Sequence, residues 1–277
     1  MLGLVKLVKF IRVAFKINWF KTLYLNLKTQ KLAVALRLPI VVYGKVKVKS
    51  LQGNIIFDCP IKFGTLQIGR DIDYFSFSYL PSIISIFSGK VIVKGRVLIS
   101  GGNTIICNGG TITLGKFVVL ASGVNIRSYR NIVVGNYTRI ASNCFVMDTN
   151  VHYLINKDSK IIRKIEDDII IGKYCWLNSG TLVSKGSKIP DYSISSRNSY
   201  LNRDYTLEGT TGLLLVGSPA VSKGQNYQRI FSYSIEKRIS NIFRGDLGLT
   251  EINLAQIGYD EAYVDNDMDF EQMFQVF

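Results

Sequence analysis

The 277-residue sequence predicts a mainly β fold, a β-solenoid with α-helices at its two ends. In the middle of the chain, aliphatic residues recur at every sixth position in short runs, a period that fits neither an isolated helix nor a hairpin sheet. Several aliphatics that open a run are followed by glycine, and Asn, Ser, Gly and Asp are common between them, as tight corners require. Near both termini, the apolar residues instead follow helical spacing.

The N-terminal element is a basic arm over residues 1–40. Residues 2–20, LGLVKLVKFIRVAFKINWF, place aliphatic side chains on one helical face with lysine and arginine beside it, and the first acidic residue of the chain is Asp58. This pattern is typical of a helix lying in an anionic membrane surface, where each basic side chain contributes about 1 kcal/mol. It equally suits a helix packed on its own domain, and we keep both interpretations. The arm contains no nucleic-acid-binding motif, so we expect no nucleic-acid partner.

The second element, residues 41–221, carries the six-residue repeat. A period of six is typical of a β-helix, in which each hexad forms a short strand and a corner and its aliphatic side chain enters the central stack. The runs of stacked aliphatics are Val93, Ile99, Ile105; Leu114, Leu120, Ile126; Val134, Ile140, Val146; and Ile171, Leu177, Val183, Ile189. The glycines that follow coil-opening aliphatics are Gly69, Gly115, Gly135 and Gly172.

The last two elements follow the repeat. Phe231, Ile235, Ile239 and Ile242 have helical spacing and Gly245 is a suitable end, which predicts a C-terminal helix within residues 222–245. Residues 246–277 contain eight acidic residues and no Lys or Arg, which predicts a separate acidic tail.

The repeat region resembles the left-handed β-helix hexapeptide-repeat acyltransferases, including galactoside, maltose and xenobiotic acetyltransferases and bacterial surface-polysaccharide O-acetyltransferases. Three segments carry the resemblance: VGNYTRIASN, IGKYCWLNSGTLVSKGSKI and the closing turn VGSPA. The resemblance implies a left-handed β-helix, a homotrimer, acetyl-CoA as co-substrate, and O-acetylation of a carbohydrate hydroxyl. With the basic arm, it favours an acceptor in surface polysaccharide or its lipid-linked precursor.

His152 is the only histidine of the chain and the main catalytic candidate. The six-residue period breaks there, and the charged residues 153–168 predict a loop extruded from the solenoid. Histidine has an unperturbed pKa of about 6.5 and suits proton transfer near neutral pH. The resemblance implies that His152 is a general base, which removes a proton from the acceptor hydroxyl during attack on the thioester.

Other site residues are assigned less directly. Asp148 would orient the imidazole or contact the substrate, or else it caps a turn. The resemblance implies that Asn143 and Trp176 bind substrate, Trp176 from a neighbouring subunit. It implies that Asn202 and Arg203 lie near the CoA nucleotide, and Lys185 could assist them. The chain departs from the family pattern at 195–198, where SSRN replaces Gly-Ala-Gly, at Ile189-Pro190, and in a longer loop at 204–213.

Several alternatives accompany this interpretation. Acyl transfer to a soluble sugar or an amino-sugar nucleotide, and a non-catalytic β-helix scaffold, are both kept. One histidine and four cysteines without paired spacing predict no metal site, which argues against the zinc-dependent carbonic anhydrase of the same fold. No apolar run is long enough to predict a transmembrane helix, and lysines interrupt any signal-peptide core. We expect a cytoplasmic protein, peripheral on the inner face of the membrane where the arm binds lipid.

Overall fold

The computed structural model describes residues 14–70, 80–253 and 257. They belong to two compact units, of which residues 14–228 form one and the residues from Arg229 onward belong to the other. Most of the predicted N-terminal helix and acidic tail lie outside the described residues.

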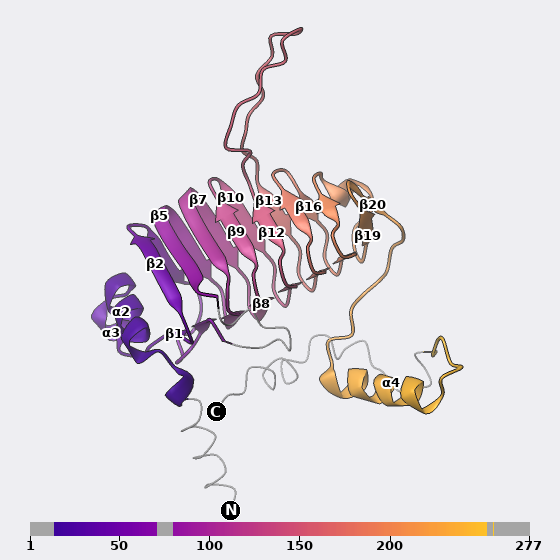
Figure 1. The fold of residues 1–277 in the computed structure, drawn as a ribbon, viewed down its shortest axis with the longest axis horizontal. Coiled ribbons are helices and arrows are strands. Elements are labelled where there is room, and N and C mark those ends of the chain that lie inside the picture. The colour runs from indigo at the N-terminus through magenta and orange to yellow at the C-terminus, as the bar shows by residue number, and fades with distance from the viewer. Residues whose placement is uncertain (1–13, 71–79, 254–256, 258–277) are drawn as a thin grey trace, which may run out of the picture. The chain divides into compact units, whose positions relative to one another are not determined.

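The described residues between Ile40 and Gly217 form the parallel β-helix that the sequence predicts (Figure 1). Each coil passes through three faces, and each strand pairs in parallel with the equivalent strands of the coils before and after it. The first face contains β1 (Ile40–Val42), β4 (Leu66–Ile68), β6 (Val97–Ile99), β8 (Val118–Leu120), β11 (Arg139–Ile140), β14 (Trp176–Leu177), β17 (Ile194–Ser195) and β19 (Leu214–Gly217).

The second and third faces belong to one continuous sheet. The second face contains β2 (Val46–Leu51), β9 (Asn125–Ser128), β12 (Phe145–Met147), β15 (Leu182–Ser184) and β18 (Tyr200–Leu201). The third contains β3 (Asn54–Phe57), β10 (Asn131–Val134), β13 (Ile169–Ile171) and β16 (Lys188–Ile189). β5 (Ser82–Val93) and β7 (Thr104–Leu114) run across both faces and join them. Strict six-residue counting therefore fails between Ile105 and Leu114.

The predicted hexad aliphatics form the core. Each of them, from Val93 to Ile189, is at most 5% exposed. They stack in register from coil to coil, as Ile126 does with Val146 and Val146 with Val183. Ser195 takes an inward position between Leu177 and Leu215 on the first face, and its buried hydroxyl lies 2.8 Å from Thr181 Oγ1. A single polar residue is tolerated at this level of the stack because its hydroxyl is hydrogen-bonded.

The N-terminal end of the β-helix is covered by α2 (Trp19–Thr29) and the short α3 (Leu32–Ala35). Polar side chains of α2 form hydrogen bonds with backbone groups at the open edge of β1. Asn26 Nδ2 donates to the Ile40 carbonyl at 2.7 Å, the Ile40 N–H donates to Asn26 Oδ1 at 3.1 Å, and the Val42 N–H donates to Thr22 Oγ1 at 3.0 Å. These bonds satisfy groups that an uncovered edge strand would leave unpaired.

At the C-terminal end, β20 (Ala220–Ser222) turns back to pair antiparallel with β19, and the loop before β19 contains the 3-10 helix η1 (Tyr205–Leu207). In the other unit, α4 (Tyr233–Gly245) is the predicted C-terminal helix and ends at the expected glycine. Ser232 caps its N-terminus by accepting a hydrogen bond from the Ile235 N–H at 3.3 Å.

Candidate functional site

The segment that carries His152 is a hairpin, residues 149–168, which projects from the corner between β12 and β13 (Figure 1). Antiparallel bridges join Thr149 to Glu166 and Ile155 to Ile162. β12 still pairs with β9 and β15, and β13 with β10 and β16, so the coils stack without interruption on both sides of the insertion. The predicted loop is present and begins slightly earlier in the chain than expected.

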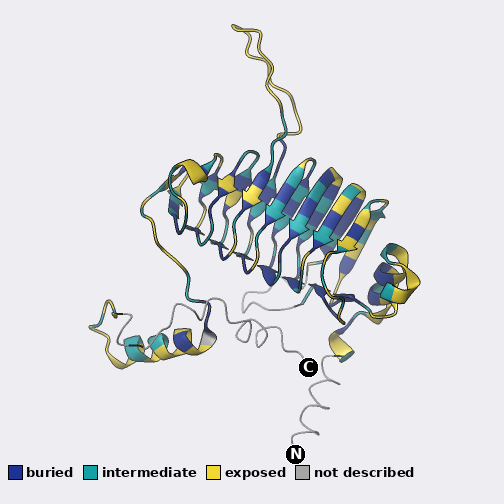
Figure 2. Cartoon of the chain, turned by 180° about the vertical axis from the view of Figure 1, so that it is seen from behind, coloured by how far each residue is buried: buried dark blue, intermediate teal, exposed yellow. Residues whose placement is uncertain are grey.

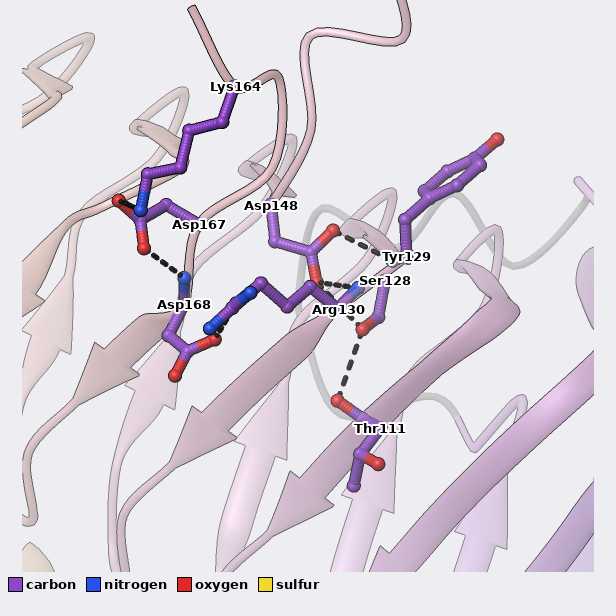
Figure 3. Close-up of polar contacts among 8 residues, drawn as sticks. All are labelled: Thr111, Ser128, Tyr129, Arg130, Asp148, Lys164, Asp167 and Asp168. Atoms are coloured by element: carbon purple, nitrogen blue, oxygen red, sulfur yellow. Dashed lines mark hydrogen bonds and ion pairs between the residues drawn. The ribbon is translucent and has the colours of Figure 1, made fainter.

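Asp148 fixes the base of this hairpin (Figure 3). Its fully buried carboxylate accepts hydrogen bonds from the Ser128 hydroxyl at 2.8 Å, the Tyr129 N–H at 2.7 Å and the Arg130 N–H at 2.9 Å. The backbone carbonyl of Asp148 accepts a further bond from the Asp167 N–H at 3.0 Å. Of the two roles predicted for Asp148, turn capping is the one its contacts display, and the carboxylate makes no hydrogen bond to the described His152.

Two ion pairs hold the returning strand of the hairpin (Figure 3). Arg130 Nε lies 2.6 Å from Asp168 Oδ1, which ties the hairpin to the preceding coil. Lys164 Nζ lies 2.8 Å from Asp167 Oδ2, and this hydrogen bond lowers the pKa of the Asp167 carboxyl below its ordinary value. Both pairs are largely exposed, so we assign them a role in orientation and little stability.

His152 lies near the root of the hairpin with an exposed side chain, and residues 150–164 of the projection are exposed (Figure 2). It lines a groove of about 370 Å³ formed by residues of both strands of the hairpin together with Lys185. The groove is lined by Asn150, His152, Leu154, Ile155, Asn156, Ser159, Ile161, Arg163, Lys164, Ile165 and Lys185. Three of these side chains are cationic and none is acidic. Because Lys164 is paired with Asp167, Arg163 and Lys185 are the two that favour an anionic ligand.

Lys185 is the one other predicted site residue that the structure brings to this groove. It follows β15, in the next coil, and its Nζ donates to the Lys164 carbonyl at 3.1 Å. Sequence reasoning missed Arg163 and Lys164. The sequence shows that residues 153–168 carry both acidic and basic side chains. Which of these side chains line the groove depends on the register of the hairpin, which the bridge between Ile155 and Ile162 defines.

The remaining predicted residues lie elsewhere on the β-helix. Asn143 is exposed at a corner, where its φ of 60° is the left-handed conformation that asparagine tolerates well. Trp176 lies on β14, half-buried, between Arg139 and Ile194 of the adjacent strands. Arg203 Nε is 2.8 Å from Glu208 Oε1, and Asn202 is exposed beside it. None of these side chains lines the groove.

No group of three His, Cys, Asp or Glu side chains among the described residues could hold a metal ion. None of the helices in this part of the chain is long and apolar enough to cross a membrane. All four cysteines are free thiols, and Cys107, Cys144 and Cys175 are buried.

The chain is similar in structure to several solved acyltransferases. The polySia-specific acetyltransferase NeuO matches with a TM-score of 0.40 and 16% identity, over 74% of this chain and 98% of that one. The polysialic acid O-acetyltransferase OatWY gives 0.37 and 16%, over 68% and 99%. The N-acyltransferase AntD from Bacillus cereus, with dTDP and 3-hydroxybutyryl-CoA, gives 0.39 and 11%, over 76% and 89%.

No protein-family model and no curated protein matches the sequence. The described residues form a parallel β-helix with a hairpin that carries His152.

Proposed function

We propose that this protein is an acetyl-CoA-dependent O-acetyltransferase that acts on a sugar hydroxyl, with His152 as the general base. The observation that carries the proposal is the placement of the only histidine: it lines a cationic groove on a hairpin anchored to a rigid β-helix. Rigid scaffolds that present loops are well suited to hold reactive groups. The motifs that resemble hexapeptide-repeat acyltransferases point to the same chemistry.

The reaction transfers one acyl group and returns one proton. His152 would remove the proton from the acceptor hydroxyl as its oxygen attacks the thioester carbonyl. The carbon–sulfur bond then breaks, and the imidazolium returns the proton to the departing thiolate. A positioned base of this kind typically contributes about 10²–10⁴-fold to the rate.

Acetyl-CoA is a substrate with several phosphates, and the basic residues near the site fit such a molecule. Lys185 and Arg163 line the groove with His152, and surface cations of this kind pair well with phosphate. Arg203 would have to exchange its Glu208 partner for a nucleotide phosphate. Asp148 serves as a positioning residue in this scheme, because it anchors the hairpin four residues before His152.

The acceptor and assembly form the finer part of the proposal. We infer a hydroxyl of surface polysaccharide or its lipid-linked precursor, and an arm of residues 1–20 that contacts an anionic membrane, because the arm combines basic and apolar residues. A homotrimer would place the outward-facing Trp176 at a subunit contact and bring Asn143 toward a shared substrate site. O-acetylation rather than N-acetylation follows from the resemblance of the motifs.

Mass spectrometry of candidate glycans tests this proposal. Wild-type protein and acetyl-CoA should add an acetyl group to a hydroxyl, and His152→Ala should reduce the transfer by about 100-fold or more. Asp158→Ala is the matched control, because Asp158 is exposed on the same hairpin but does not line the groove.

The other outcomes of this experiment separate the rival functions. Acetylation of an amino-sugar nucleotide in preference to hydroxyl acceptors would establish N-acyl transfer. Absence of both transfer and acetyl-CoA binding would indicate a scaffold. Turnover by His152→Ala equal to that of wild type would remove the base role.

A further inference from the structure

Helix α2 has its amphipathic faces reversed relative to an ordinary surface helix. The side that meets the first coil carries the polar Thr22 and Asn26 together with Leu25, and all three are buried. The outward side carries Leu23 and Leu27, which are exposed. A helix that served only to cover the β-helix would bury its apolar side chains and expose its polar ones.

The outward apolar side chains continue from α2 to α3. Phe20 is 74% exposed, Leu32 is 64% exposed and Leu36 is 72% exposed. We use the term cap surface for this set, which comprises Phe20, Leu23, Tyr24, Leu27, Leu32 and Leu36. So many large apolar side chains on two short neighbouring helices indicate a surface that something covers.

The charge of the same region is entirely basic. Lys28, Lys31 and Arg37 are exposed there, and no acidic residue occurs before Asp58. Lys21 Nζ lies 5.7 Å from the ring centre of Tyr24 and 5.9 Å from that of Phe20, so cations and aromatic rings interleave. The covering partner must therefore accept both apolar side chains and positive charge.

We propose that the cap surface docks on an anionic lipid bilayer. A bilayer takes leucine and aromatic side chains into its acyl boundary while its headgroups pair with lysine and arginine. A protein partner fits less well because lysine is depleted at protein–protein interfaces. A nucleic acid has no apolar layer for four leucines. This docking is separate from the proposed acyl transfer, and apart from Phe20 it uses residues that follow the segment 1–20.

Vesicle co-sedimentation of the full-length protein tests the inference. Wild-type protein should bind vesicles of phosphatidylcholine with phosphatidylserine more tightly than phosphatidylcholine alone. The variant Leu23→Gln, Leu27→Gln, Leu32→Gln, Leu36→Gln leaves residues 1–20 intact and should bind about 100-fold more weakly. The control Leu207→Gln, Leu247→Gln removes exposed leucines elsewhere and should bind like wild type.

Charge variants test the electrostatic part. Lys28→Gln, Lys31→Gln should weaken binding by about fivefold for each charge removed. The control Lys49→Gln, Lys90→Gln removes two exposed lysines outside the cap surface and should change binding much less. Equal effects of the two pairs would show only a response to net charge and would overturn the docking site.

A spectroscopic measurement avoids altering the cap surface. Trp176→Phe leaves Trp19, which is 43% exposed at the start of α2, as the only tryptophan. Its fluorescence should shift to shorter wavelength when phosphatidylserine vesicles are added, and the shift should be lost when the four leucine substitutions, which leave residues 1–20 intact, are added to Trp176→Phe. An unshifted spectrum, or a leucine variant that changes self-association while vesicle binding stays at the wild-type level, would overturn the lipid assignment.

Discussion

Replacement of Asp148 should damage the fold before it damages catalysis. Asp148→Ala removes the acceptor for the Tyr129 and Arg130 N–H groups, whereas the Ser128 hydroxyl retains the Thr111 carbonyl at 3.1 Å. Each N–H left without a partner costs about 1–3 kcal/mol, so we expect a loss of about 2–6 kcal/mol. For a chain of this size, each kcal/mol lowers the melting temperature by about 2 °C, so the expected fall is roughly 4–12 °C.

Asp148→Asn should lose less stability than Asp148→Ala. Its amide oxygen can keep one of the two N–H donors while its NH₂ group faces the other, so we expect a loss of about 1–3 kcal/mol. Thermal melts followed by circular dichroism, with hydrogen exchange at the amides of Tyr129 and Arg130, measure both variants. If Asp148→Asn melts like wild type while acyl transfer falls 100-fold, the carboxylate acts on the imidazole and our account of the turn is wrong.

Further expectations concern the corners and the core. Gly89→Ala should be strongly destabilising, by about 3 kcal/mol or more, because its φ is 81° and a Cβ would overlap the Gly110 carbonyl oxygen. Gly109→Ala is the matched control, because its φ is 86° but no atom lies nearer than 3.9 Å to the added carbon. It should cost only about 1–2 kcal/mol of stability. Equal losses of stability for the two variants in denaturant unfolding would contradict the steric argument. Burial raises the pKa of Cys144 and that of Cys175 to about 12. The folded protein keeps these thiol protons at pH values where the unfolded chain has lost them. The free energy of unfolding should therefore be unaffected below about pH 8.5 and should fall as pH rises toward 12. Unfolding curves recorded across that range should show a weaker pH dependence for the double variant Cys144→Ala, Cys175→Ala.

The sequence predicts the core of this fold well. Inward positions such as Val134, Ile140 and Val146 are aliphatic in most coils, so their six-residue period is visible without any knowledge of pairing. The corner between the second and third faces was not predictable in the same way. β5 and β7 pass through it without a break, and no period marks a strand that changes face.

The candidate site was predicted in part for a similar reason. His152 stands out in the sequence because it is unique and because the repeat stops beside it. The partners of Asp148 lie 18 to 20 residues earlier in the chain, on the neighbouring coil, and only the stacking register brings them together. The polar inner side of α2 was also missed, because the role of Thr22 and Asn26 depends on the backbone edge of β1, which lies 14 to 20 residues later in the chain.

The uninterrupted pairing of β12 and β13 has a consequence for how this chain can change. Because both strands keep their neighbours above and below, the coil stack gains nothing from the length or composition of residues 149–168 beyond its two ends. Residues 150–165 can therefore be exchanged as a unit, while Asp167 and Asp168 keep their contacts with Asp148 and Arg130. Such exchanges would change the ligand preference of the groove while the melting temperature of the β-helix stays the same.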